Sequence, residues 1–306
     1  MIGEEVKNID MDLIYKISNR CDLLLGKFGL NFSWLNHKNS VRSFVCRFVR
    51  DMKLNFDEYS LCRGNSIIWV FWAQGESNMP NVVRSCYESI LKNKGELSVV
   101  LLDENNYSKY VSVPEKVCKK LQHGLITITH FSDILRFALL KKYGGFWLDA
   151  TIYVTSTIKM PNTLFTIRQK GHSDYIAQNR WCGFLWYAPQ GHPLTSFCYS
   201  FLCEYWLKYN ELLDYFLIDY VIEYFYNHSK DFKNEIDELQ CSNEYLYFFQ
   251  NSCCEEQYDE MKWKEVCKKT QFLKTSWKKN YLVEKNGSET YYGRILSHGL
   301  NHNTSI

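Results

Sequence analysis

Short apolar runs alternate with helical patterns along the first half of the chain, and this alternation restricts the fold more than any other feature. The run SIIWVFWAQG at 66–75 is nearly continuous in apolar residues and ends in glycine, as is typical of a buried parallel strand leading into a loop. A second run, ELSVVLLDE at 96–104, is preceded and followed by helical patterns. LITIT at 125–129, a helical run over 132–143 and FWLD at 146–149 continue the series. The alternation predicts an α/β fold with a mostly parallel central sheet flanked by helices, and ligand sites beyond the carboxyl ends of its strands.

A helical region precedes the alternating one. Apolar residues recur at helical spacing over 14–24, and VRSFVCRFVRDMKL at 41–54 repeats the pattern with basic residues between the apolar ones. Such a basic amphipathic segment can lie on an anionic membrane, or it can pack on a core with its charged face in water. We expect residues 1–63 to form an N-terminal helical extension and residues 64–306 to form a single α/β domain.

The alternation loosens after residue 151. The runs IYVT, TLFTI and GFLWYA suggest a β excursion, and helical patterns follow near residues 193–208, 212–227 and 256–269. No internal repeat or low-complexity tract interrupts the chain.

Composition excludes several classes of protein. Aromatic residues make up 16% of the 306 positions and only 5 residues are proline, which indicates a packed globular chain. The 36 basic and 34 acidic residues nearly balance, so no strong field favours a nucleic-acid partner. Neither a P-loop nor a G-x-G-x-x-G pattern occurs, so the sequence contains no recognisable motif for binding ATP or NAD.

Cysteine usage and the N-terminus bear on the compartment. The twelve cysteines include no C-x-x-C pair and no Cys/His cluster at zinc spacing, which predicts free thiols in a reducing cytoplasm. The opening MIGEEVKNID is acidic where a signal peptide is basic, and no apolar run follows it. No stretch approaches about 18 uninterrupted apolar residues. We expect a cytoplasmic protein, and any contact with a membrane should be peripheral.

The segment HFSDILRFALLKKYGGFWLDATIYV, residues 130–154, carries the strongest chemical signal. Asp133 and Arg136 share one side of a predicted helix whose other face is apolar, and Gly144 supplies a left-handed stop. A strand then delivers Asp149 at its end, where a buried acid is costly unless it holds a cation or a hydroxyl. Taken singly, the pair could be a surface ion pair and Asp149 a capping residue. Their order and spacing together are more specific.

Asp133-x-x-Arg136 followed by KYGGFWLDAT resembles the nucleotide-sugar site of the capsular polysaccharide synthesis proteins and of glycosyltransferase family 32, which is also similar to the catalytic domain of the clostridial glucosylating toxins. IIWVFWAQG fits the first strand of those enzymes, and THFSDILRFALLKKYGGFWLDATIYVT at 129–155 is very similar to the capsular proteins. The resemblance is dense over 66–155 and continuous but thinner toward the C-terminus. It implies the GT-A fold, the nucleotide-diphospho-sugar transferase architecture, for residues 64–306.

The resemblance assigns roles to four residues. Trp69 matches the aromatic residue that stacks on uracil, although a core tryptophan fits the same strand position. Asp133 and Arg136 match the pair that grips the donor sugar hydroxyls, for which a carboxylate and a guanidinium fork are suited. Asp149 matches the first acid of the Asp-x-Asp motif, which binds ribose and a divalent cation, Mn²⁺ or Mg²⁺.

The second acid of that motif is missing. Thr151 stands in its place and is a neutral ligand at best, so a cation would depend on Asp149, the diphosphate oxygens and water. His298 in LSHGL is the candidate to complete the metal shell; a solvent-exposed histidine near the end of the chain is the alternative.

Two later segments contribute weaker candidates. Asp219 interrupts an apolar helical run, and an acid there could orient the acceptor or steady an oxocarbenium-like transition state, or simply face solvent. Lys274, Trp277 and Lys278 in FLKTSWKKN could close over the diphosphate and neutralise the leaving group, or form a basic surface loop.

The resemblance implies a retaining transferase that moves a hexose, galactose or glucose, from a UDP-sugar to a lipid-linked oligosaccharide in bacterial capsular or surface polysaccharide synthesis. Other polysaccharide synthesis enzymes would then be partners. The alternative is a catalytically inactive nucleotide- or glycan-binding subunit of such an assembly. A glycoside hydrolase is disfavoured, because it needs two carboxylates flanking the bond and no UDP site.

Overall fold

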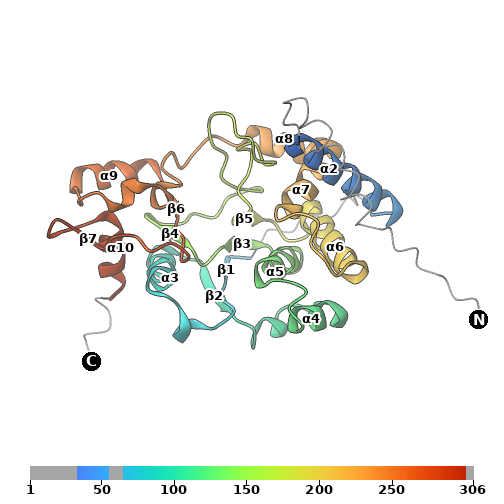
Figure 1. The fold of residues 1–306 in the computed structure, drawn as a ribbon, viewed down its shortest axis with the longest axis horizontal. Helices are drawn as coiled ribbons and strands as arrows, with labels where there is room; N and C mark the ends of the chain where they lie inside the picture. Colours follow the sequence, from blue (N-terminus) through green and yellow to red (C-terminus); the bar gives the residue numbers. More distant parts are fainter. Residues whose placement is uncertain (1–32, 55–64, 301–306) are drawn as a thin grey trace, which may run out of the picture.

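The computed structural model describes residues 33–54 and 65–300, with side chains described over 37–54 and 65–297. Its centre is a four-stranded sheet in the order β2-β1-β3-β5 (Figure 1). The first three strands are mutually parallel, and β5 is antiparallel to β3. The strands are β1 Ile67–Phe71, β2 Ser98–Leu102, β3 Gly145–Leu148 and β5 Leu185–Ala188. The mostly parallel sheet confirms the predicted α/β class and agrees with a GT-A-like arrangement.

Helices cover both faces of this sheet (Figure 1). One face packs on α5, and α6, α7 and α2 form a further layer behind that helix. The other face packs on α3 and α10. The helices are α2 Ser33–Asp51, α3 Asn81–Asn93, α4 Glu115–Gln122, α5 Ile128–Tyr143, α6 Pro193–Lys208, α7 Leu217–His228, α8 Lys230–Glu238, α9 Glu260–Lys269 and α10 Tyr291–Leu300. Two small antiparallel pairs complete the described β structure, formed by β4 Ile152–Val154 with β6 Phe272–Lys274 and by β7 Glu284–Lys285 with β8 Ser288–Glu289.

Successive side chains of a strand point to opposite faces of the sheet, and the core is therefore divided into two clusters. Ile68 and Val70 of β1 belong to the cluster under α3 and α10, and Trp69 belongs to the one under α5. On that face the register pairs Trp69 with Trp147, and Trp147 with Trp186, so three buried tryptophans form a row across neighbouring strands. Bulky aromatic rings thus fill the space between the sheet and α5.

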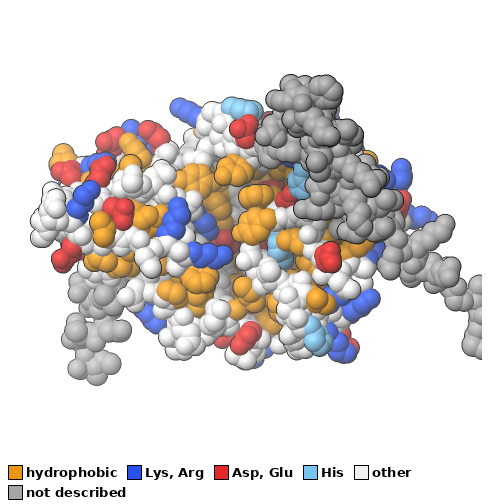
Figure 2. Space-filling view, in the orientation of Figure 1, with side chains coloured by type: hydrophobic (Ala, Val, Ile, Leu, Met, Phe, Trp, Pro, Cys, Tyr) orange, Lys and Arg blue, Asp and Glu red, His pale blue; other side chains and the backbone are white. Residues whose placement is uncertain are grey.

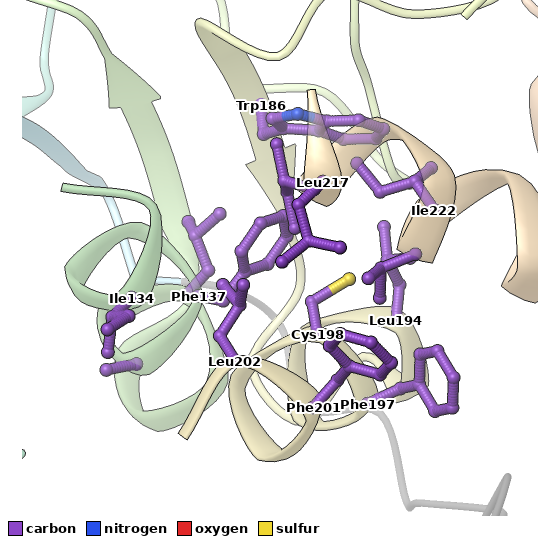
Figure 3. Packing of buried hydrophobic residues seen from close by; sticks show 14 of the residues in the cluster. Ile134, Phe137, Trp186, Leu194, Phe197, Cys198, Phe201, Leu202, Leu217 and Ile222 are labelled. Carbon is purple, nitrogen blue, oxygen red and sulfur yellow. The ribbon is translucent and has the colours of Figure 1, made fainter. Parts of the chain in front are cut away.

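The core under β5 is built from helices α5, α6 and α7 (Figure 3). Phe137 of α5, Cys198 and Leu202 of α6 and Leu217 of α7 converge there beneath Trp186 (Figure 3). All are buried, and their side chains interdigitate between the three helices. This packing holds the start of α7, and with it Asp219, against the body that carries the sheet.

Helix α2 turns its apolar face toward the same core. The Phe48 ring lies 4.9 Å from the Phe201 ring of α6, and Arg42 donates two hydrogen bonds to Glu223 of α7, at 2.8 and 2.9 Å. The basic amphipathic segment therefore packs on the core, in agreement with the second of its two interpretations. Over residues 33–54 and 65–300, no helix combines the length and apolar character needed to cross a bilayer. The pattern over 14–24 lies outside the described residues.

Several predicted elements differ from the structure. LITIT is no strand; Thr127 caps α5 by accepting a hydrogen bond from the His130 backbone N–H, so the helix begins at Ile128, earlier than predicted. TLFTI makes only an isolated bridge, from Phe165 to Tyr187. IYVT forms β4, as predicted, but its partner β6 lies about 120 positions further along the chain, and no local pattern predicts that pairing.

The two glycines between α5 and the rest of β3 serve different needs. Gly144 ends α5 with a φ of 67°, as predicted. Gly145 has a φ of 94°, and a Cβ there would lie 2.5 Å from the Ile67 carbonyl oxygen. Glycine is therefore what allows β3 to lie beside β1. This pairing brings the end of β3 to the end of β1.

Candidate active site

A pocket of about 460 Å³ opens at the carboxyl ends of β1 and β3. Its walls come from residues 71–74 at the end of β1, Trp147 and residues 149–151 at the end of β3, the start of α5, Tyr215, and residues 274–278 at the end of β6. Basic and hydrophobic side chains surround a hollow near the centre of the face seen in Figure 2. The pocket occupies the edge of the sheet where parallel α/β folds bind ligands, as predicted.

Asp149 is the centre of a hydrogen-bonded network on the pocket floor. Its Oδ1 accepts from Arg136 Nη2 at 3.1 Å and from Trp147 Nε1 at 2.9 Å. Its Oδ2 accepts from Lys274 Nζ at 3.2 Å. Burial alone would raise the pKa of the Asp149 carboxyl, but Lys274 and Arg136 outweigh it and hold the pKa below the ordinary value. The carboxylate therefore stays ionised, and the capping alternative does not describe it.

Asp133 and Arg136 are buried behind the residues that line the pocket, and Arg136 contacts one of these, Asp149. Arg136 Nη1 donates to Asp133 Oδ1 at 2.6 Å, and the guanidinium lies over the Trp147 ring at 5.1 Å. Both side chains are buried, with Arg136 only 4% exposed, so the alternative of a surface ion pair is wrong. Neither residue lines the pocket. Their contact with donor hydroxyls stays a prediction. Their observed ion pairs are with each other, with Asp149 through Arg136, and with His130 through Asp133, whose Oδ2 lies 3.7 Å from His130 Nδ1.

The structure corrects the position predicted for the uracil-stacking tryptophan. Trp69 is 1% exposed, its indole N–H donates to the Gly144 carbonyl at 3.0 Å, and its ring packs between Tyr110 and Tyr143. It does not line the pocket. Strand alternation points Trp69 into the core beneath α5, in agreement with the alternative of a core tryptophan.

Trp72, and not Trp69, is the tryptophan of this segment that lines the pocket. It follows β1 by one residue, lines the pocket, and meets Trp277 edge to face at 5.7 Å between ring centroids. The location of Trp72 at the pocket could have been predicted from the sequence. Trp72 lies near the end of the apolar run, where parallel sheets bind ligands, whereas Trp69 lies in the middle of the run. Trp277 is 47% exposed, and Lys278 stands over its ring at 5.8 Å. Lys274, Trp277 and Lys278 all line the pocket, and their contact with a diphosphate stays a prediction.

The residues around Asp149 do not fit a divalent cation. Both Asp149 oxygens already accept from cationic or indole donors, and Thr151 Oγ1 accepts from Lys274 Nζ at 2.7 Å. Across the described residues, no three His, Cys, Asp or Glu side chains gather as ligands. The side chain of His298 lies outside the described ones. The ammonium of Lys274 stands between the two positions, 149 and 151, that were predicted to hold the metal.

Asp219 lies in the first turn of α7, behind the pocket wall. It is half-buried, and its Oδ1 accepts from Trp181 Nε1 at 2.9 Å. Burial raises the pKa of this carboxyl to about 6, and the nearby Asp133 charge adds to the rise. Asp219 is thus a partly desolvated acid next to the Asp133–Arg136 pair, and not a helix acid fully in water.

Asp219→Asn should stabilise the protein near neutral pH. The pKa of Asp219 is higher in the folded chain than in the unfolded one, so wild-type stability falls as pH rises from about 4 through 6. Asparagine keeps the acceptor for Trp181 and removes this cost, which raises the free energy of unfolding at pH 7.5 by on the order of 2 kcal/mol. Urea unfolding at pH 4.5 and pH 7.5 measures it. A variant less stable than wild type at pH 7.5 would contradict the assignment.

Similarity to a known protein family extends over most of the chain. The model of the capsular polysaccharide synthesis protein family matches residues 35–295. The O-glycosyltransferase braB of Annulohypoxylon truncatum is 34% identical in an alignment of 92 residues, which covers 27% of this chain and 22% of that protein. Among solved structures, the PaToxG glycosyltransferase aligns with a TM-score of 0.41 and 12% identity, over 65% of this chain and 82% of that one.

The chain therefore belongs to the capsular polysaccharide synthesis protein family, which confirms the resemblance found in the sequence. The match includes α2 as well as the sheet and the loop that carries Lys274.

Proposed function

We propose that this protein is a retaining glycosyltransferase that moves a hexose, galactose or glucose, from a UDP-sugar to a lipid-linked oligosaccharide in capsular or surface polysaccharide synthesis. The observation that carries the proposal is the pocket at the end of the parallel strands. It combines the rings of Trp72 and Trp277 with the ammonium groups of Lys274 and Lys278 and the carboxylate of Asp149. Flat apolar faces suit a base, and lysines suit a diphosphate.

The arrangement suggests how the donor binds. The uracil packs against Trp72 and Trp277, the diphosphate lies beside Lys274 and Lys278, and the hexose lies toward Asp149 and the start of α5. Lysines at the diphosphate stabilise the charge that develops on UDP as it leaves. Because Asp149 stays ionised, it can accept a hydrogen bond from a hydroxyl of the donor. Positioning and charge stabilisation then carry most of the rate, without a protein nucleophile.

Exposed aromatic rings beside the pocket mark where the acceptor binds in this proposal. Tyr215 lines the pocket and is 60% exposed, and its neighbour Phe216 lies 5.8 Å from the exposed ring of Tyr175. Rings of this kind present flat surfaces to sugar rings. The lipid portion of the acceptor would keep the protein at the cytoplasmic face of the membrane, where other polysaccharide synthesis enzymes act.

A non-catalytic binding subunit is the second candidate, and the burial of Asp133 and Arg136 favours it. Purified protein with a panel of UDP-sugars, with and without lipid-linked acceptors, separates the two through the release of UDP. Acceptor-dependent UDP release supports the transferase. UDP binding without turnover on any donor would support the binding subunit.

Trp72→Ala tests the nucleotide position directly. Base–aromatic stacking is worth about 1–3 kcal/mol, so the Kd for UDP measured by calorimetry should rise by roughly 5- to 150-fold. The control is Trp69→Phe, which keeps an aromatic ring in the core and should leave the Kd unchanged. The reverse result, with UDP affinity lost in Trp69→Phe and kept in Trp72→Ala, would return the base to the position first predicted from the sequence.

A further inference from the structure

We propose that the Lys274 ammonium takes the role of the divalent cation at this site, so that UDP-sugar binding and transfer proceed without a metal. The inference rests on the proposed function and concerns the group that faces the diphosphate. Family resemblance implies a cation bound by an Asp-x-Asp motif, and the residues around Asp149 do not fit one. Geometry, charge and donor count each point to Lys274 in its place.

The geometry follows from the pairing of β4 with β6. Ile152, the first residue of β4, is in register with Lys274, the last residue of β6. The Thr275 N–H and hydroxyl both donate to the Thr151 carbonyl at 2.9 Å, which fixes the start of the loop. Lys274 Nζ is thereby held 3.2 Å from Asp149 Oδ2 and 2.7 Å from Thr151 Oγ1. The ammonium bridges the first and third positions of Asp-Ala-Thr, as a metal would bridge two carboxylates.

Two carboxylates and two cations balance each other in the hydrogen-bonded network around Asp149. The carboxylates of Asp133 and Asp149 are matched by the cations of Arg136 and Lys274, and Lys278 adds a further positive charge on the pocket wall. A divalent cation at Asp149 would lie beside two fixed cations, whereas such ions bind where oxygen ligands carry net negative charge. A diphosphate anion, in contrast, is attracted to the same surface.

Threonine in place of the second acid suits an ammonium. A hydroxyl oxygen accepts a hydrogen bond from Lys274 without adding the second charge that a metal requires. The ring of Phe184 lies 4.6 Å from Nζ and supports the cation from another side. An ammonium has three N–H donors, of which Asp149 and Thr151 take two among the described residues. The third is available for a diphosphate oxygen, since Lys274 lines the pocket.

The first test compares UDP binding by calorimetry in excess chelator with binding in excess Mn²⁺ or Mg²⁺. We expect Kd values equal within about twofold, because Lys274 supplies the charge in each case. Electron paramagnetic resonance of Mn²⁺ should show only the free ion when protein is added, with or without UDP. If Mn²⁺ tightens UDP binding tenfold or more, Lys274 does not replace the metal, while the proposed function stands. If UDP binds in neither condition, both fail.

Lys274→Met supplies the second test, because methionine keeps much of the side-chain length and removes the charge. The Kd for UDP in chelator should rise by roughly 10- to 100-fold, and Lys274→Arg should recover most of the affinity. Lys268→Met removes one charge from an exposed position on α9 and should change nothing. Circular dichroism checks that each variant is folded. UDP affinity unchanged in a folded Lys274→Met variant would overturn the proposal.

Discussion

Turnover of the UDP-sugar should fall by about 10²- to 10³-fold when Asp149 is replaced by asparagine. Asparagine has nearly the same shape but carries no charge, so Arg136 and Lys274 lose the anion that they share. Its NH₂ group also replaces one carboxylate oxygen, and therefore faces donors on Arg136, Trp147 or Lys274 instead of accepting from them. The network that positions Lys274 toward the pocket then loosens. Single-turnover release of UDP from the preferred donor measures the effect.

Asp231→Asn is the matched control for this variant. Asp231 is an exposed acid in the first turn of α8, outside the pocket, so its loss changes the net charge equally without touching the network. Turnover should stay within twofold of wild type. An Asp149→Asn variant that is folded and retains a tenth or more of wild-type turnover would contradict the role given to the network.

The free energy of unfolding should fall by about 3–5 kcal/mol in Arg136→Met. Methionine fills much of the volume of the arginine stem but leaves the buried Asp133 without its partner at 2.6 Å and removes one donor from Asp149. An unpaired buried carboxylate takes up a proton more readily, so the pKa of Asp133, which burial already raises despite Arg136, rises further. The loss of stability should therefore be larger at pH 8 than at pH 5. Urea unfolding at the two pH values measures both effects.

Two further variants separate charge from geometry at this position. Arg136→Lys keeps the charge but cannot reach Asp133 and Asp149 with one planar fork, so it should recover only part of the stability. Asp133→Leu combined with Arg136→Met removes both members of the pair and should be more stable than Arg136→Met alone. If the double variant is less stable than the single one, the cost does not come from the unpaired carboxylate.

Local patterns in the sequence were sufficient for the strands that carry the site. Apolar runs predicted β1, β2 and β3, and the glycines after α5 fixed where β3 begins. Asp149 could be predicted at the pocket because it follows the carboxyl end of a parallel strand, and ligands bind at that edge of such sheets. Asp133 and Arg136 were predicted as neighbours from their spacing on one helix.

Contacts between distant parts of the chain could not be predicted from local patterns. The positions of Trp69 and Trp72 in one apolar run favour Trp72 at the pocket, but the packing of Trp69 beside Trp147 follows from the pairing of β1 with β3. The ion pair of Lys274 with Asp149 depends on the pairing of β6 with β4, which joins segments with no shared local signal. The resemblance implied a metal at residues 149 and 151, and no local pattern could reveal the lysine that contacts both of them.

A crystal structure of the protein with UDP bound in the presence of chelator tests the central claim most directly. The account predicts the uracil ring packed on Trp72, and a diphosphate oxygen within hydrogen-bond distance of Lys274 Nζ, with Asp149 and Thr151 still bonded to that lysine. UDP bound away from this pocket, or Lys274 displaced from Asp149 with the diphosphate out of its reach, would contradict it.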